Sequence, residues 1–189
     1  LRCVVTATID GKQYRNLTTS GYEVEKIQPT VKMPEDFNGF WNKTKTELSK
    51  LPIDAKFIPL PEKSSATTNV YHVNFQGYGA SRIYGILCVP KKPGKYPAVL
   101  QVPGAGIRPY GPDLELADQG VIVLTVGIHG IPVTMDVSVY NDLSTGSLKG
   151  YFFNNMDDKD KYFYKRVYAN CVRANDFIFS LPEFISSSS

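Results

Sequence analysis

Apolar and polar side chains alternate with a period of two over residues 1–9, a pattern typical of a β-strand. Asp10-Gly11 then supplies a tight turn, and a second, more polar strand follows over residues 13–18. A hairpin by itself is only marginally stable in water. We therefore expect residues 1–30 to be the end of a β-rich N-terminal domain. Because Leu1 already lies inside the pattern, we expect that domain to begin before it.

A helical pattern follows. Apolar side chains recur at spacings of three and four within residues 33–51, which predicts a helix. Pro34 suits an early helical position, with Glu35 and Asp36 in a first turn where the helix dipole favours acidic groups. Pro52 marks its end. The expected stripe consists of Phe37, Phe40, Trp41, Thr44 and Leu48.

Residues 69–76 and 82–90 predict an antiparallel pair of strands. The first range alternates, with Val70 and His72 on one face and Val73 on the other. A turn containing two glycines separates the two ranges. The pattern therefore favours a β-meander after the first helix.

Two further segments predict a parallel sheet. Residues 97–102 and 121–126 are short and almost continuously apolar, as in strands buried on both faces. A short helix is expected between them, over residues 113–118. This order of strand, loop, helix and strand is typical of an α/β fold.

The last part of the chain predicts a long loop and a helix. Residues 127–158 are rich in glycine, asparagine and aspartate, and the stretch is longer than most connectors, which is typical of a functional loop or an insertion. An apolar stripe over residues 164–181 then predicts a helix. Asp157 or Asp158 is the expected N-cap, and Pro182 marks the end.

Composition excludes several classes of protein. The 189 residues carry a formal net charge of +3, which argues against nucleic acid as a partner. The apolar runs are far shorter than the ~20 residues that span a bilayer, so no membrane span is predicted. Cys3, Cys88 and Cys171 lie far apart without the spacing of metal ligands. We therefore expect no metal site, and we expect Cys88 and Cys171 to act as small buried apolar residues.

The sequence contains no complete catalytic set. A nucleophile elbow needs Gly-x-Ser-x-Gly, and no serine of the chain has glycine at both of those positions. His72 lies in a predicted strand, where a structural role is the simpler interpretation. His129 follows the second buried strand, so we expect it near the carboxyl ends of the parallel strands, where α/β sheets bind ligands.

Small residues follow the first buried strand, at Gly104-Ala105-Gly106. The exposed N–H groups of such a turn can stabilise an oxyanion, and a simple tight turn is the alternative. Pro109 stands where a dinucleotide fingerprint needs a third small residue, so no cofactor of that kind is predicted. Asp157, Asp158 and Asp160 are candidate cation ligands, but a solvated loop and helix cap is the simpler interpretation.

Three groups of residues, taken together and in this order, are typical of one enzyme family. They are Asp36-Phe37 with Phe40-Trp41, then Val73-Asn74-Phe75-Gln76-Gly77-Tyr78 with Ser81-Arg82-Ile83-Tyr84-Gly85, then Tyr162-Phe163-Tyr164-Lys165-Arg166-Val167 with Val172-Arg173-Ala174. With them the chain resembles, from Pro34 onward, the acetyl xylan esterase/cephalosporin C deacetylase family of α/β-hydrolases. The resemblance implies an α/β fold in which residues 34–189 form the N-terminal half of an α/β-hydrolase sheet, preceded by a short β segment.

The resemblance also implies roles for particular residues. In the family, the turn after the first buried parallel strand contains a tyrosine whose backbone N–H is an oxyanion donor, and Ala105 occupies that position here. The acidic residue usual in the last helix is Asn170. The family's nucleophile strand follows that helix, so residues 34–189 are expected to stop before the nucleophile, the acid and the base. A sheet without that strand exposes an unpaired edge, so we expect these residues alone to be poorly stable.

The leading hypothesis is a fragment of a serine carbohydrate esterase that hydrolyses acetyl esters of a polysaccharide or oligosaccharide. Its partner would be the acetylated carbohydrate, no cofactor is needed, and the fragment alone would be inactive. A non-catalytic carbohydrate-binding or scaffold module, and another α/β-hydrolase such as a peptidase, are the alternatives.

Location and assembly are less constrained by the sequence. Residues 1–30 lie outside the shared region and resemble the extra N-terminal β domain of some Bacteroides-type carbohydrate enzymes. This implies a periplasmic or secreted protein, with a cytoplasmic one left open. The sequence also leaves homo-oligomerisation open and identifies no substrate-binding residues.

Overall fold

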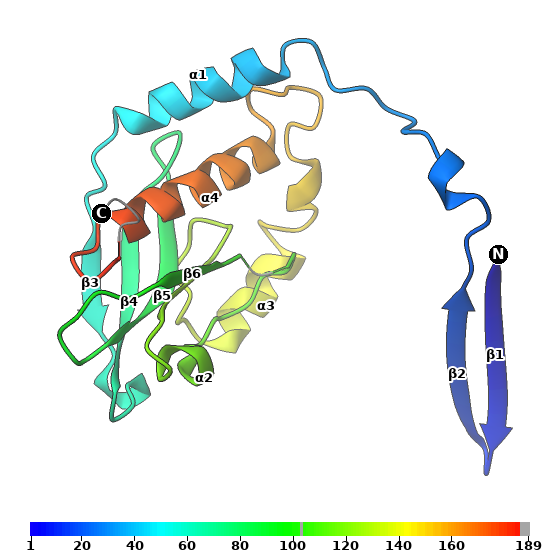
Figure 1. Cartoon of the computed structure of the whole chain (residues 1–189), viewed down its shortest axis with the longest axis horizontal. Coiled ribbons are helices and arrows are strands. Elements are labelled where there is room, and N and C mark those ends of the chain that lie inside the picture. Colours follow the sequence, from blue (N-terminus) through cyan, green and yellow to red (C-terminus); the bar gives the residue numbers. More distant parts are fainter. Residues whose placement is uncertain (103, 186–189) are drawn as a thin grey trace. The chain divides into compact units, whose positions relative to one another are not determined.

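The computed structural model describes residues 1–102 and 104–185 of the chain (Figure 1). The chain divides into two compact units, Leu1–Asn38 and Gly39–Ser189. Among the described residues, no helix combines the length and the apolarity needed to cross a bilayer.

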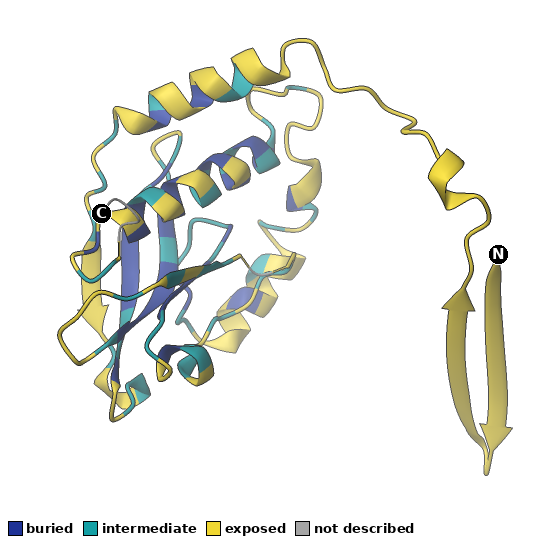
Figure 2. Cartoon of the chain, in the orientation of Figure 1, coloured by how far each residue is buried: buried dark blue, intermediate teal, exposed yellow. Residues whose placement is uncertain are grey.

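The first unit is built on the predicted hairpin. Strands β1 (Arg2–Ile9) and β2 (Lys12–Thr19) pair antiparallel, and the short helix η1 (Val24–Lys26) follows. Asp10 and Gly11 have φ of 50° and 75°, as a two-residue turn between twisted strands requires. Every residue of both strands is exposed (Figure 2). The assignment of this segment to a larger β domain stays a prediction.

The second unit contains a five-stranded mixed sheet. Its strands are β3 (Lys56–Pro59), β4 (Thr68–Gln76), β5 (Arg82–Pro90), β6 (Ala98–Gln101) and β7 (Ile122–Val126). The order across the sheet is β3-β4-β5-β7-β6. The pairs β3–β4, β4–β5 and β5–β7 are antiparallel, and β6 runs parallel to β7. The predicted meander and the predicted parallel pair are both confirmed.

Helices cover both faces of this sheet, because its strands alternate two sets of apolar side chains. On one face, Val73 and Phe75 pack against α4 (Phe163–Phe179), and the Phe75 and Phe177 rings stack with centroids 4.3 Å apart. On the other face, Val70 packs with Ala117 of α2 (Leu114–Ala117), which Asp113 caps. The predicted α2 is therefore confirmed, together with the expected alternation in β4.

Helix α1 (Phe37–Ser49) runs alongside α4 (Figure 1), and aromatic side chains join the two helices. The Trp41 and Tyr168 rings lie edge to face with centroids 6.0 Å apart. Lys165 Nζ lies 4.7 Å from the centroid of the Phe40 ring. The helix begins later than predicted, because the Pro34 carbonyl accepts a bond from Phe37 N–H in a separate turn. Acidic groups on an exposed segment do not by themselves extend a helix, because most helical stability comes from packing.

Helix α4 also begins differently from the prediction. Tyr162 occupies the N-cap position and makes no side-chain cap, so the expected capping by Asp157 or Asp158 is wrong. The Asp158 carboxylate instead accepts a hydrogen bond from Asp160 N–H at 2.9 Å. A short polar side chain bonds a nearby backbone group as readily in a turn as at a helix start, and the sequence does not distinguish the two.

The stretch 127–158 is not an irregular loop. It contains α3 (Val137–Thr145) and the short helix η3 (Tyr151–Phe153). Asp136 caps α3, and the rings of Tyr140 and Tyr151 are buried. The two helices were not predicted because the glycine, asparagine and aspartate residues at their turns and caps are typical of loops.

Arg173 joins three parts of the second unit. From α4 it donates to the carbonyl of Gln76 at the end of β4, at 3.1 Å, and to the carbonyl of Leu51 after α1. Its side chain is 4% exposed and lies 3.6 Å from Asp176. Leucine at this position would leave two carbonyls without their donor and a carboxylate without its cation.

We expect Arg173→Leu to lower the free energy of unfolding by about 2–4 kcal/mol, as loss of a partly buried polar network does. Urea unfolding followed by circular dichroism measures the change. Arg15→Leu, on the exposed strand β2, is the matched control and should shift the midpoint little. Equal shifts for the two variants would contradict the prediction.

Candidate active site

The carboxyl ends of β6 and β7 lie side by side, because the two strands are parallel neighbours. The turn Gly104-Ala105-Gly106 follows β6, and Gly127 to Gly130 follow β7. His129 Nε2 lies 3.0 Å from the carbonyl oxygen of Gly106, so the structure joins the two candidate segments. Ala105 itself is exposed beside this contact.

The ring of His129 is fixed as one neutral tautomer. A carbonyl oxygen only accepts hydrogen bonds, so Nε2 carries the proton. Nδ1 is buried without a hydrogen-bond partner among the described residues, and the ring stands edge to face on Tyr151 with centroids 4.6 Å apart. Burial lowers the pKa of His129, the bond with Gly106 opposes this, and the charge of Arg166 lowers the pKa further. Because Nδ1 is enclosed, His129 is not placed to take a proton from a substrate.

Arg108 contacts the same turn from another direction. Its guanidinium donates to the carbonyl oxygens of Gly104 and Ala105, each at 3.3 Å, and lies 5.7 Å from the centroid of the Tyr110 ring. Gly106 has φ of 143°, and a Cβ built there would lie 2.6 Å from Arg108 Nη1. The backbone conformation therefore favours glycine at position 106, and a Cβ there would displace the end of the Arg108 side chain.

Sequence reasoning missed the contacts of Arg108 and Tyr151. The available signal for Arg108 was its place two residues after the glycine turn. Tyr151 lies more than 20 residues after His129, and no periodic pattern joins the two. Only the folded chain shows that both contact the segments after β6 and β7.

The second histidine is structural, as predicted. His72 lies in β4, is 7% exposed, and accepts a long hydrogen bond of 3.5 Å from Val133 N–H. Its ring stacks on Tyr84 with centroids 5.9 Å apart. Burial, and then the charge of Lys63, lower its pKa. The histidine is therefore held neutral inside the fold, away from the turn at Ala105.

Cys88 and Cys171 are not nucleophiles at this site. Cys88 is fully buried in β5, and burial raises the pKa of its thiol to about 11, so the thiol is protonated at neutral pH. Burial also raises the pKa of Cys171, which is half-buried. The predicted apolar role of Cys88 is confirmed.

The acidic residues before α4 bind lysines. Asp158 lies 3.1 Å from Lys161, and Asp160 lies 2.8 Å from Lys165. Hydrogen bonds from these lysines lower the pKa of both carboxyl groups. Within 1–102 and 104–185, no group of three or more histidine, cysteine, aspartate or glutamate side chains is arranged to hold a metal ion.

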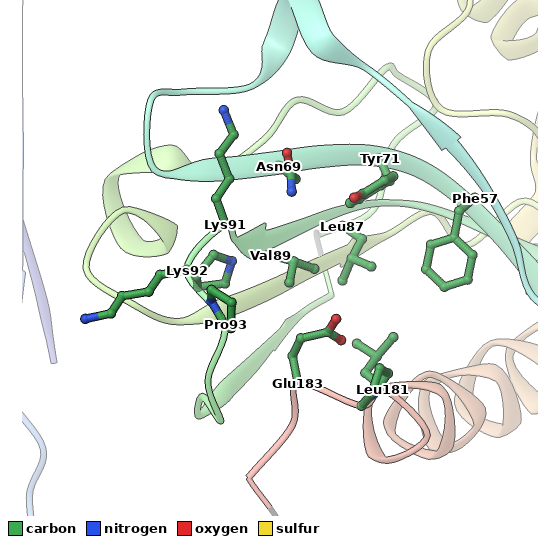
Figure 3. A pocket seen from close by; sticks show the side chains of 12 residues that line it. Phe57, Asn69, Tyr71, Leu87, Val89, Lys91, Lys92, Pro93, Leu181 and Glu183 are labelled. Carbon is green, nitrogen blue, oxygen red and sulfur yellow. The ribbon is translucent and has the colours of Figure 1, made fainter.

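A separate pocket of about 600 Å³ lies at the opposite end of the sheet, between the connection after β5 and the end of α4 (Figure 3). Phe57, Leu87 and Leu181 give it an apolar lining. In Figure 3 the amino groups of Lys91 and Lys92 point away from the pocket. Because β5 runs antiparallel to β7, this end of the sheet is remote from the turn at Ala105.

Comparison with known proteins identifies the family. The family model for acetyl xylan esterase (AXE1) matches residues 16–186, which is most of the chain. The chain belongs to the acetyl xylan esterase family. A curated family relative, acetyl esterase Axe7A of Xylanibacter ruminicola, is 34% identical over 182 residues, covering 94% of this chain and 41% of that protein. The chain thus spans less than half the length of this relative.

Solved structures of acetyl xylan esterases share the fold. The enzyme from Paenibacillus sp. R4 superposes with a TM-score of 0.68 and 27% identity, covering 83% of this chain and 51% of that one. Acetyl xylan esterase 1 from Thermoanaerobacterium sp. JW/SL YS485 superposes with a TM-score of 0.66 and 21% identity, covering 80% of this chain and 48% of that one. The predicted α/β fold and the predicted family are both confirmed.

The family model matches the chain from residue 16, which is earlier than the sequence motifs predicted. Residue 16 lies inside β2, so the expectation that the shared region starts at Pro34 is wrong. The short strand is exposed on both faces and carries no residue with a special chemical role. The motifs on which the resemblance was based therefore did not include this part of the family match.

Proposed function

We propose that the chain is the N-terminal part of a serine carbohydrate esterase that removes acetyl groups from an acetylated polysaccharide or oligosaccharide. The family match over residues 16–186 carries this proposal. The named relative, an acetyl esterase, supports an acetyl ester as the bond that is cleaved.

In the proposed reaction, a serine Oγ attacks the acetyl carbonyl carbon, and a histidine takes the serine proton. The sugar oxygen leaves with that proton, and water then hydrolyses the acetyl-serine to acetate and the free enzyme. The carbonyl oxygen becomes an oxyanion in each step, and the Ala105 N–H is the proposed donor to it. The exposure of Ala105 at the carboxyl end of β6 supports this role.

We place the serine, the acid and the base in a continuation of the chain. No serine of the 189 residues has the Gly-x-Ser-x-Gly context, and neither histidine is placed to act on a substrate. The relative's greater length leaves room for these groups.

The end of α4 supports a continuation that adds a strand beside β6. After the helix, Phe184 forms a parallel bridge with Tyr96, just before β6. Tyr96 N–H donates to the Glu183 carbonyl at 2.8 Å, and Ile185 N–H donates to the Tyr96 carbonyl at 3.0 Å. The next residue, Pro97, bonds to β7, and backbone groups alternate sides along a strand. The bridge therefore lies on the outer edge of β6, where a nucleophile strand would pair.

The test is acetate release from acetylated xylan by the full-length protein, compared with the 189-residue chain. Acetate released only by the full-length protein, and lost when its nucleophilic serine is replaced by alanine, is the expected result. Glycan binding without acetate release would instead indicate a binding module, and cleavage of peptides would indicate a peptidase.

We also propose that the protein acts outside the cytoplasm. A polysaccharide is too large to cross a membrane unaided, so an enzyme acting on it must reach it outside. Fractionation of the source cells tests the location, and recovery of the protein in the cytoplasm would contradict it.

A further inference from the structure

Three successive carbonyl groups of the turn after β6 accept hydrogen bonds from two side chains. The guanidinium of Arg108 donates to the carbonyls of Gly104 and Ala105, each at 3.3 Å. His129 Nε2–H donates to the carbonyl of Gly106 at 3.0 Å. The two side chains come from different segments, one following β6 and the other following β7.

These contacts set the direction of the N–H groups. In a trans peptide unit, the C=O and the next N–H point in opposite directions in one plane. The Gly104 carbonyl is directed at Arg108, so the Ala105 N–H is directed away from it. By the same argument, the Ala105 carbonyl directs the Gly106 N–H away from Arg108. The N–H groups of Ala105 and Gly106 thus face away from Arg108.

We propose that Arg108 and His129 are positioning residues that preorganise the Ala105 N–H for the oxyanion. This inference rests on the proposed role of Ala105. Neither side chain touches the reacting atoms. They act by preventing the turn from rotating its peptide planes, and preorganised donors stabilise a transition state without reorganisation during the reaction.

Two independent features support this assignment. Gly106, with φ of 143°, lets the Arg108 guanidinium lie where a Cβ would displace it, since a Cβ built there is 2.6 Å from Nη1. His129 is itself held, because its ring packs on Tyr151 and lies 5.8 Å from Phe163 between ring centroids. Within residues 1–102 and 104–185, the enclosed Nδ1 of His129 has no hydrogen-bond partner, and Nε2 bonds to the turn.

The experiment uses the full-length protein and pairs of variants that keep or remove the donor. Arg108→Met and His129→Leu remove it, whereas Arg108→Lys and His129→Gln retain an N–H donor. We expect each of the first two to lower kcat for acetyl ester hydrolysis about tenfold with KM nearly unchanged, since only transition-state stabilisation is lost. The donor-retaining variants should recover most of the rate. Arg15→Met, on exposed β2, is the control for loss of a positive charge.

A second measurement does not depend on activity. Nitrogen-15 NMR of the imidazole should show His129 as the neutral tautomer protonated at Nε2. The other tautomer would overturn the proposal, whatever the rates. Urea unfolding of each variant identifies any loss of rate that follows from loss of the fold.

The outcomes separate this inference from the proposed function. L-lactic acid in place of Ala105 removes the N–H but keeps the side chain. If that change lowers kcat while Arg108→Met and His129→Leu stay within twofold of the unmodified enzyme, the positioning role is overturned and the donor role stands. If it leaves kcat unchanged, the role of Ala105 fails and the inference fails with it. A rise in KM alone in the donor-removing variants also overturns the positioning role.

Discussion

Full-length protein carrying L-lactic acid in place of Ala105 is expected to hydrolyse acetyl esters with kcat lowered about 10²–10³-fold, the usual cost of losing one oxyanion donor. The change replaces one N–H by an ester oxygen that cannot donate. Because the donor bonds most strongly to the charged oxygen of the transition state, KM should change little. Steady-state kinetics with p-nitrophenyl acetate measure both constants.

The matched control is L-lactic acid in place of Ala80, which is exposed in the turn between β4 and β5. It carries the same chemical change in a turn that β7 separates from β6 in the strand order, and its kcat should equal that of the unmodified protein. A kcat that is the same for the two modified proteins would show that Ala105 is not the donor.

The 189-residue chain expressed by itself is expected to be several kcal/mol less stable than the same residues in the full-length protein. A strand beside β6 would cover Val99 and Val102, which are 38% and 44% exposed in this structure. Covering a few hundred Å² of apolar surface is worth several kcal/mol at ~25 cal/mol per Å², against a typical net stability of ~5–15 kcal/mol. Urea unfolding and gel filtration measure stability and self-association.

Hydrogen exchange localises the effect to one edge. The alternation along β6 places the N–H groups of Ala98 and Leu100 on the outer edge with Tyr96, and those of Val99 and Gln101 toward β7. We expect slow exchange at Ala98 and Leu100 only in the full-length protein. Val99 and Gln101, which face β7 in both proteins, are internal controls.

Other results would contradict this prediction. A cooperative, monomeric 189-residue chain with the same unfolding midpoint as the full-length protein would show that the edge of β6 needs no further strand. Fast exchange at Ala98 and Leu100 in the full-length protein would show that no strand pairs there.

Much of the fold follows from patterns that are local in the sequence. Three kinds of pattern each identify an element: the alternation in β4, the apolar runs of β6 and β7, and the Asp10-Gly11 turn. The spacing of apolar residues along a strand depends on whether one face or both faces of the strand are buried. Helix ends were predicted less well. The start of α1 and the cap of α4 depend on which backbone groups find partners, and several local arrangements compete at similar free energy.

The candidate site was predictable only in part. Sequence order alone placed Ala105 and His129 after parallel strands, and hence at one end of the sheet. Their contact joins residues 23 positions apart, and neither its length nor the tautomer of His129 is visible in the sequence. The hydrogen bonds from Arg108 to the turn accompany a φ of 143° at Gly106, which a glycine permits but does not require.

By itself, then, the sequence determined the α/β class, the family resemblance and the absence of a nucleophile elbow, because periodicity and motifs are properties of neighbouring residues. The tertiary structure alone decided which carbonyls Arg108 and His129 hold, and on which edge of β6 the chain after α4 begins to pair. Those facts depend on where distant segments meet in space. The burial of side chains on both faces of the sheet sets those meeting points, and no local pattern records them.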